Sequence, residues 1–246
     1  MKVWTVLPAY NEAGSLLPLL DSLLSRFQEA GVAIEVLVID DGSTDSTPDI
    51  AGSYSSRNVR TLRNSTNQGL AETLKRGLLE TTRQASQDDI IITMDADNTH
   101  PVEVTFQMLD SIEKGADVVI ASRYREGSAV RGLSSFRRTM SFGASWLFRI
   151  FFPTPGVRDF TCGFRAYRAS ALRTVIAKHG PLFISEKGFT CMVDLLLRMR
   201  QENFTFSEVP MILRYDLKNN HSKMKVARTI AETLTLLFRR RLGAPL

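Results

Sequence analysis

Two aspartates that lie two residues apart, Asp95 and Asp97, directly follow the apolar run 90–94. Carboxylate oxygens are hard ligands that suit Mg²⁺ or Mn²⁺, and such an ion can bridge protein carboxylates and a diphosphate. A D-x-D pair alone is common by chance, but its place at the end of a strand-like run indicates a function. We therefore predict a divalent metal site at this pair.

Two further polar turns follow apolar runs nearer the N-terminus. Asp41 follows the run 33–39, where a carboxylate can accept hydrogen bonds from a nucleotide base or ribose. Tyr10 and Glu12 follow the run 2–7, where the ring can stack on a base and the carboxylate can reach a ribose. The alternatives are an ordinary strand-to-helix turn and an acidic first helical turn, which is stabilising by itself.

Apolar runs and helical patterns alternate over the first 120 residues and must position these turns. Runs rich in Val, Ile and Leu, without strict alternation, are typical of strands buried on both faces. The β-α-β-α order predicts an α/β fold with a mostly parallel sheet flanked by helices, and ligands of such sheets bind beyond the carboxyl ends of the strands. We expect strands at 2–7, 33–39, 59–62, 90–94 and 117–121. We expect helices at 12–30, 69–85 and 101–114, and a further helix that begins at Thr47. Asn11 is expected to cap the first of them.

The regular alternation stops after residue 121. We expect a loop at 123–138, an aromatic-rich helix at 141–152, helices at 169–178 and 188–200, an extended segment at 204–213, a flexible polar segment at 215–221 and a final helix at 224–242. Because the chain has no repeat, low-complexity tract or clear linker, we predict a single domain over residues 1–246.

Composition and charge narrow the possible functions. With 43% hydrophobic and 23% charged residues the chain is typical of folded proteins, and its two cysteines predict neither a disulfide framework nor a zinc site. We find no signal segment and no apolar run of 18 residues, and expect a cytoplasmic protein. Residues 1–120 hold 9 basic and 18 acidic side chains, and residues 121–246 hold 22 and 8. This asymmetry indicates a cation site and an anion site, or two unequal solvated faces.

The ordered motifs of the chain resemble those of the GT-A glycosyltransferases of family 2. In the first half the matching segments are 7–12 (LPAYNE), 39–43 (IDDGS), 67–70 (NQGL) and 94–97 (MDAD). The second half is similar to the dolichol or polyprenyl phosphate mannose synthase branch of that family. Its matching segments are 121–124 (ASRY), 137–138 (RR), 161–167 (TCGFRAY), 186–189 (EKGF) and 208–210 (EVP).

The resemblance implies an inverting enzyme that moves one sugar, mannose or a similar hexose, from a GDP- or UDP-sugar to a polyprenyl or dolichyl phosphate. Residues 1–122 would bind the donor and residues 123–246 the acceptor. The implied site consists of Pro8, Tyr10, Glu12, Ile39 and Asp41 around the nucleotide; Asp95, Ala96 and Asp97 around the metal and diphosphate, with Asp97 as direct ligand; Arg123 and Arg137 at the acceptor phosphate; and Arg214 and Lys223 closing over the donor diphosphate.

Some residues depart from the family pattern. Thr99 replaces a glutamine that contacts the metal, so either its hydroxyl or a water would take that ligand position. Asp194 stands where the family usually has glutamate, and it is our first candidate for a general base if the acceptor is a hydroxyl. His100, next to the metal motif, is expected to cap a helix.

Alternative functions remain open from the sequence. One is the same donor chemistry with a soluble hydroxyl acceptor, such as a natural product. Another is a non-catalytic basic module that binds membranes or nucleic acid, although no nucleic-acid motif is present, so we expect no nucleic-acid partner. No P-loop motif and no Q-x-x-R-W motif occurs, which excludes a P-loop NTPase and favours single-sugar transfer.

Two basic and apolar stretches could lie on a membrane surface or pack into the core. One is the amphipathic segment 223–241, with basic and apolar residues at helical spacing. The other combines Trp146, Phe148, Ile150, Phe151 and Phe152 with Arg137, Arg138 and Arg149. We therefore expect a peripheral protein at the cytoplasmic membrane face if the acceptor is a lipid phosphate.

Overall fold

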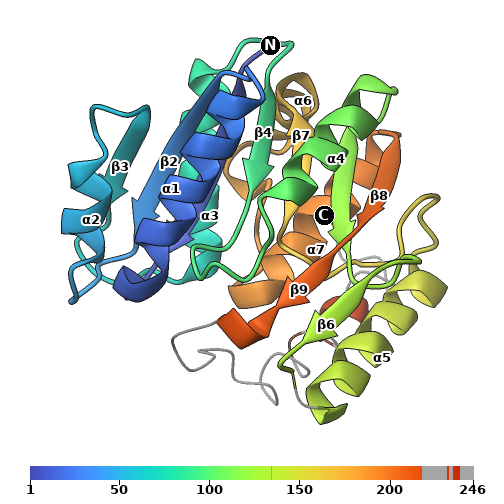
Figure 1. Ribbon diagram of the computed structural model, residues 1–246. Coiled ribbons are helices and arrows are strands. Elements are labelled where there is room, and N and C mark those ends of the chain that lie inside the picture. Colours follow the sequence, from blue (N-terminus) through green and yellow to red (C-terminus); the bar gives the residue numbers. More distant parts are fainter. Residues whose placement is uncertain (134, 218–231, 233–234, 239–246) are drawn as a thin grey trace.

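The computed structural model describes residues 1–133, 135–217, 232 and 235–238, and it centres on a seven-stranded sheet (Figure 1). The strands follow the order β3-β2-β1-β4-β7-β5-β8, and β7 alone among them runs antiparallel to its neighbours. Their bounds are β1 Val3–Ala9, β2 Ile34–Asp40, β3 Val59–Arg63, β4 Ile90–Thr93, β5 Val118–Ser122, β7 Arg165–Arg168 and β8 Phe206–Pro210. The predicted α/β fold with a mostly parallel sheet is confirmed.

Helices cover both faces of this sheet (Figure 1). One face carries α1 (Ala13–Glu29), α2 (Thr47–Ser53) and α4 (Glu103–Glu113), and the other carries α3 (Leu70–Gln84), α6 (Ala169–His179) and α7 (Cys191–Gln201). The leucines of α1 recur at helical spacing, which buries one face of this helix. The Phe27 ring of α1 packs against the Phe106 ring of α4 at 4.9 Å, so the two helices form one layer.

A smaller unit lies at the end of the sheet toward which β2 and β4 point (Figure 1). It contains the parallel strand pair β6 (Ala129–Arg131) and β9 (Ile212–Arg214), and the helix α5 (Ser135–Phe151). Short 3-10 turns follow α6 at Gly180–Leu182, precede α7 at Gly188–Thr190 and follow β9 at Tyr215–Leu217.

The second half of the chain corrects one sequence prediction and contains one strand that was not predicted. The predicted loop at 123–138 contains β6 and the first turn of α5. The predicted extended segment at 204–213 is confirmed, and it forms two strands, β8 and β9, which pair in different sheets. Strand β7 was not predicted, because its four residues begin and end with arginine and resemble a polar turn. Short strands such as β6 and β7 are stabilised by pairing with distant strands and not by a long apolar run of their own.

The two predicted halves of the chain share one sheet. Strand β7 comes from the half at 123–246, yet it lies between β4 and β5 of the half at 1–122. Registered pairs join Ile92 to Ala166 and Val119 to Ala166. The boundary between donor and acceptor halves is therefore no structural division of the fold.

Helix α3 approaches the sheet closely at Gly77. A Cβ atom on Gly77 would lie 2.5 Å from Cγ1 of Val6 and 2.6 Å from Cδ1 of Ile39. Both neighbours are fully buried strand residues, so neither has free space to move into. The short distance between α3 and strands β1 and β2 thus requires a residue without a side chain at position 77.

We predict that Gly77→Ala lowers the free energy of unfolding by about 1–3 kcal/mol, because overpacking outweighs the higher helix propensity of alanine. Urea denaturation followed by circular dichroism measures this change. Gly52→Ala in α2 is the matched control, because nothing lies within 4 Å of its Cβ position, and it should raise stability slightly. Equal stability of the Gly77 variant and the wild type would contradict the packing argument.

Candidate active site

The polar turns predicted from the sequence lie at one edge of the main sheet. Strands β1, β2 and β4 are parallel, and β5 has the same direction because β7 is antiparallel to both β4 and β5. Their carboxyl ends therefore meet at one edge (Figure 1). Tyr10, Asp41, Asp95 and Arg123 follow these four ends, so the predicted convergence of the turns is confirmed.

The Asp41 carboxylate organises the loop that follows β3. It is buried, and it accepts hydrogen bonds from Nδ2 of Asn64 (2.8 Å), the N–H of Gln68 (2.8 Å) and the N–H of Gly69 (2.9 Å). Gly42 has a φ of 71°, and a Cβ there would lie 2.7 Å from a backbone carbon of the same loop. Asp41 thus holds the loop after β3 in place, and its role as a nucleotide contact stays a prediction.

The turn after β1 is tied to the turn after β2. The N–H of Asn11 donates to Oγ of Ser43 (2.9 Å), and Oδ1 of Asn11 accepts from the N–H of Thr44 (2.8 Å). The N–H of Glu12 donates to Oγ1 of Thr47 (2.8 Å). The predicted capping role of Asn11 is wrong, because Glu12 is the residue before α1 and makes no side-chain cap bond there. Asn11 instead joins the two turns.

The remaining predicted nucleotide contacts differ in exposure. Pro8 and Tyr10 are partly exposed at the end of β1, where they can border a ligand. Glu12 is almost completely buried. The Ile39 side chain is fully buried and packs toward Gly77 of α3, so it belongs to the core. If Ile39 borders the nucleotide as predicted, it must do so through its backbone, because its side chain is buried.

The turn after β4 holds both predicted metal-binding aspartates. The Asp95 carboxylate is 45% exposed, whereas Asp97 is 6% exposed and Ala96 between them is buried. Asn98 has a φ of 59°, a left-handed conformation that asparagine tolerates better than most residues. The chain then returns toward Asp97, and the Thr99 hydroxyl donates to Oδ1 of Asp97 at 2.7 Å.

The residues of this turn fit a hard divalent cation. Within the described residues no group of three or more His, Cys, Asp or Glu side chains could hold a metal by itself. Mg²⁺ commonly takes one or two carboxylates and completes its octahedron with phosphate oxygens and water. Asp95 and Asp97 supply that number of carboxylates. Thr99 is 2% exposed and donates to Asp97, which favours a supporting role over its predicted role as a ligand.

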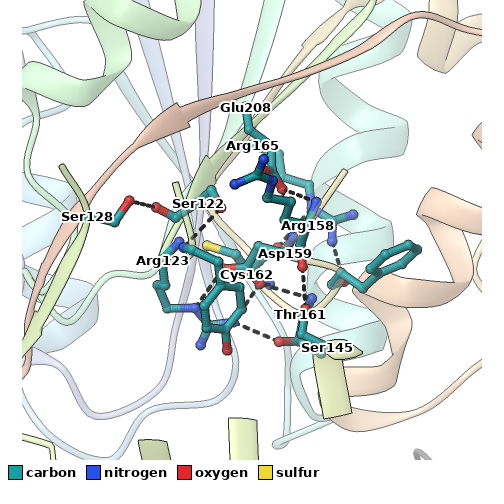
Figure 2. Close-up of polar contacts among 12 residues, drawn as sticks. Ser122, Arg123, Ser128, Ser145, Arg158, Asp159, Thr161, Cys162, Arg165 and Glu208 are labelled. Atoms are coloured by element: carbon teal, nitrogen blue, oxygen red, sulfur yellow. Dashed lines mark hydrogen bonds and ion pairs between the residues drawn. The ribbon is translucent and has the colours of Figure 1, made fainter. Parts of the chain in front are cut away.

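A buried carboxylate holds the Arg123 side chain at the end of β5 (Figure 2). Nε and Nη2 of Arg123 donate to the two oxygens of Asp159 at 2.8 and 2.7 Å, and Nη2 also donates to Oγ1 of Thr161 at 2.7 Å. Burial alone would raise the pKa of Asp159, but the charge and hydrogen bonds of Arg123 outweigh burial and lower that pKa. Arg123 is therefore rigidly placed, with Nη1 outside this fork.

Glu208 of β8 holds the same segment from the other side (Figure 2). Its Oε1 accepts the N–H of Arg158 at 2.6 Å and the N–H of Asp159 at 2.7 Å. Burial raises the pKa of Glu208, and the nearby Asp159 charge adds to that increase. The Glu208 carboxylate thus fixes the backbone at 158–159, and the Thr161 side chain, which follows, accepts a hydrogen bond from Arg123.

The fully buried Arg165 joins this segment to the start of α7. Its guanidinium donates to the carbonyl oxygens of Phe160 (2.7 Å), Cys162 (2.8 Å) and Met192 (2.7 Å). A Cβ atom on Gly163 would lie 3.7 Å from Oδ1 of Asp95, so this segment borders the turn of the predicted metal site. Arg165 therefore brings the 160–163 segment and α7 next to the D-x-D turn.

Asp194 has a structural environment. Its Oδ2 accepts from the N–H of Ser185 (2.6 Å), the Ser185 hydroxyl (2.9 Å) and the N–H of Glu186 (3.1 Å), and Oδ1 lies 3.4 Å from Nε of Arg198. The residue is fully buried in α7. This geometry corrects the prediction of Asp194 as general base and indicates that it holds the loop before α7.

Strand β9 borders the D-x-D turn through its last residue. The N–H of Arg214 donates to the carbonyl oxygen of Thr99 at 3.0 Å, and the Arg214 guanidinium pairs with the Asp216 carboxylate at 2.8–3.1 Å. The Arg137 side chain and Lys223 lie outside the described part of the structure. So do most of the predicted flexible segment at 215–221 and of the predicted helix at 224–242.

The supporting roles of three residues were not identified from the sequence: Asp159, which lies outside the matching segments, and Arg165 and Glu208, which lie within them. Each is a charged residue within or next to an apolar segment, a pattern that indicates a buried and paired charge. Their partners lie far away along the chain; Arg123 and Asp159, for example, are separated by 36 positions. The sequence shows that a charged residue lies in an apolar segment, but it does not show which distant residue binds that charge.

Comparison with known proteins agrees with this architecture. The family model described as "Glycosyl transferase family 2" matches residues 4–176. The dolichol-phosphate mannosyltransferase of Pyrococcus furiosus is 31% identical over 97% of this chain, which spans only 63% of the length of that relative. The polyprenol monophosphomannose synthase of Mycolicibacterium smegmatis is 32% identical over 84% of this chain and 75% of its own length. The undecaprenyl-phosphate mannosyltransferase of Micrococcus luteus is 32% identical over 86% of this chain and 83% of its own length.

Solved structures show the same fold at lower identity. Glucosyl-3-phosphoglycerate synthase from Mycobacterium tuberculosis, in complex with Mn²⁺, UDP and phosphoglyceric acid, superposes with a TM-score of 0.67 at 22% identity. The match covers this whole chain and 80% of that one. The same enzyme has been solved with Mg²⁺ and UDP. With the family model matching most of the chain and the fold shared, this protein belongs to glycosyl transferase family 2.

Proposed function

We propose that this glycosyltransferase moves one hexose, with inversion, from a nucleotide-sugar to a polyprenyl phosphate at a membrane surface. The observation that carries the proposal is the meeting, at one sheet edge, of the aspartate pair Asp95 and Asp97 with the fixed guanidinium of Arg123. A carboxylate pair suits a metal-bound diphosphate, and a guanidinium suits a phosphate.

The names of the relatives support the lipid acceptor and the sugar. All three are named as mannosyltransferases or a mannose synthase that act with dolichol, polyprenol or undecaprenyl phosphate. The solved neighbours carry UDP, so the donor base, guanine or uracil, stays open. We propose mannose or a similar hexose from a GDP- or UDP-sugar.

We propose that Asp95 and Asp97 hold Mg²⁺ or Mn²⁺ together with the donor diphosphate. The ion would neutralise the negative charge that the leaving diphosphate gathers as the glycosidic bond breaks. Pro8 and Tyr10 would border the nucleotide, and the loop held by Asp41 would form the opposite wall. Arg214, now paired with the exposed carboxylate of Asp216, would exchange that partner for the diphosphate, since exposed ion pairs are weak.

A phosphate acceptor explains why no base is needed. A phosphate monoester is already an oxyanion, so it requires positioning more than deprotonation. Arg123, with Arg137 as the second predicted ligand, would orient that phosphate. The alternative with a soluble hydroxyl acceptor requires a carboxylate base. Asp194, the base considered for it, accepts three hydrogen bonds in a buried site, which favours the phosphate.

Helix α5 offers a surface for peripheral membrane contact. Phe142, Trp146 and Ile150 recur every four residues and are 53%, 52% and 52% exposed, with the exposed Arg149 beside them. Phe148 is fully buried and packs on Phe160, so the aromatic patch predicted from the sequence includes one core residue. No helix among the described residues is long and apolar enough to cross a bilayer. We propose that α5 lies at the bilayer surface and presents the site to a lipid phosphate.

Replacing Asp97 tests the metal role. Asp97→Asn should lower turnover by about 100-fold or more, because charge stabilisation of the leaving group is lost, while the melting temperature stays close to that of the wild type. Sugar transfer measured at several Mn²⁺ concentrations gives this effect, with Asp88→Asn at an exposed loop as the control. Wild-type activity in excess EDTA would refute metal dependence.

Replacing Arg123 tests the acceptor role. Arg123→Lys keeps a cation beside Asp159 but loses the bidentate fork, so we expect a higher KM for polyprenyl phosphate with little change in the KM for the donor. Kinetics at varied acceptor concentration separate the two constants. Arg57→Lys, at an exposed position in the turn between α2 and β3, is the control. Unchanged acceptor kinetics would remove the main support for Arg123 as a phosphate ligand.

Liposome binding tests the membrane surface. We expect co-sedimentation with anionic liposomes at low salt and release at high salt, because screening weakens the attraction of basic residues. A variant with Trp146→Ala and Ile150→Ala should bind at least about tenfold more weakly, since each apolar side chain contributes about 1.5–3 kcal/mol when buried. Leu17→Ala, another exposed apolar position, is the control. Binding unaffected by the double substitution would exclude α5 as the contact.

A further inference from the structure

The metal-binding turn holds each of its aspartates with a neighbouring residue of the same turn. At Asp97, both the hydroxyl and the N–H of Thr99 donate to Oδ1, at 2.7 and 3.2 Å. This oxygen therefore has a fixed direction before any ligand binds. The Thr99 side chain is 2% exposed, so water competes little for these bonds.

A second contact holds the backbone of Asp95. Its N–H donates to Nδ1 of His100 at 3.2 Å, and Nε2 of the same ring lies 3.9 Å from Oδ2 of Asp95. The imidazole is stacked on the Phe164 ring, with centroids 4.8 Å apart and planes 16° from parallel. The residue before α4 is Val102, and the buried His100 ring accepts the N–H of Asp95, so the expectation that His100 caps a helix is wrong.

The Thr99 backbone also links this turn to β9. Its carbonyl oxygen accepts the N–H of Arg214 at 3.0 Å. Threonine therefore connects two parts of the site, with the side chain on Asp97 and the carbonyl on the strand that carries Arg214.

We propose that Thr99 and His100 are positioning residues, Thr99 for the carboxylate of Asp97 and His100 for the backbone of Asp95. The inference rests on the proposed metal site and adds to it the source of its geometry. Groups that hydrogen-bond to ligating side chains fix their direction, and their loss typically costs about 10–100-fold in metal affinity. Thr99 thus orients the proposed metal ligand Asp97 and does not itself bind the metal.

Direct metal binding tests this proposal. Free Mn²⁺ is measured by electron paramagnetic resonance while the protein is titrated in the presence of GDP, and of UDP in a parallel series. Thr99→Val keeps the shape of the side chain but removes the hydroxyl, and Thr99→Ser keeps the hydroxyl. We expect Mn²⁺ affinity to fall about 10–100-fold in the valine variant and to stay close to wild type in the serine variant.

A second variant addresses Asp95 and also guards against failure of the valine variant to fold. His100→Phe retains a ring that can stack on Phe164 but has no nitrogen to accept the N–H of Asp95, so we expect weaker Mn²⁺ binding as well. Thermal denaturation checks that each variant is folded. The backbone bond between Thr99 and Arg214 persists in every variant, so it does not contribute to the differences.

The possible outcomes separate this inference from the proposed function. Wild-type Mn²⁺ affinity in folded Thr99→Val would refute the role of Thr99, and the same result for His100→Phe would refute that of His100. An equal loss in Thr99→Ser and Thr99→Val would refute the hydroxyl contact. If the wild type binds no Mn²⁺ with either nucleotide, the proposed metal site itself fails.

Discussion

The buried ion pair between Arg123 and Asp159 is the constraint on which the second half of the site depends. Asp159 is fully buried, and removing one partner of such a pair typically costs about 3–5 kcal/mol because the other charge is left uncompensated. Because the pKa of Asp159 is lowered, its carboxylate stabilises the fold at pH values above the ordinary pKa of aspartate. This contribution to the free energy of unfolding is lost as the pH falls through the lowered pKa. The raised pKa of Glu208 acts in the opposite direction and costs stability at neutral pH. The contacts of Arg165, Arg123 and Glu208 together lock the ends of three neighbouring strands, β7, β5 and β8.

Acidic side chains at this edge of the sheet have two different roles, and the role of each is related to how deeply its carboxylate is buried. Asp41 and Asp194 are buried and saturated by backbone N–H groups, so they shape loops. The Asp95 carboxylate is largely open, and Asp97 is held next to it. Buried carboxylates thus hold loops in place, whereas the aspartate pair after β4 includes the more exposed carboxylate of Asp95.

The sequence predicted the features that depend on neighbouring residues. Strands β1, β2, β4 and β5 are apolar runs of sufficient length, and the D-x-D pair is a local motif, so both were found. Strand β7 was missed because Arg165 is stable in the core only through three carbonyl partners, one of them 27 positions away in α7. Glu208 was missed for the same reason, because the N–H groups it accepts are 49 and 50 positions away. Periodicity does not report such long-range contacts.

The position of β7 has a consequence for synthesis of the chain on the ribosome. Strands β1 to β4 can pair among themselves as soon as they emerge, since their registers join only residues up to Thr93. Strand β5 emerges next, yet its only neighbours in the sheet are β7 and β8, both made later. Until then the facing edges of β4 and β5 are open to pairing with other chains. Strands β1 to β4 and the turns that follow them can therefore assemble during translation, whereas the end of β5 that bears Arg123 must wait until β8 (Phe206–Pro210) has been made.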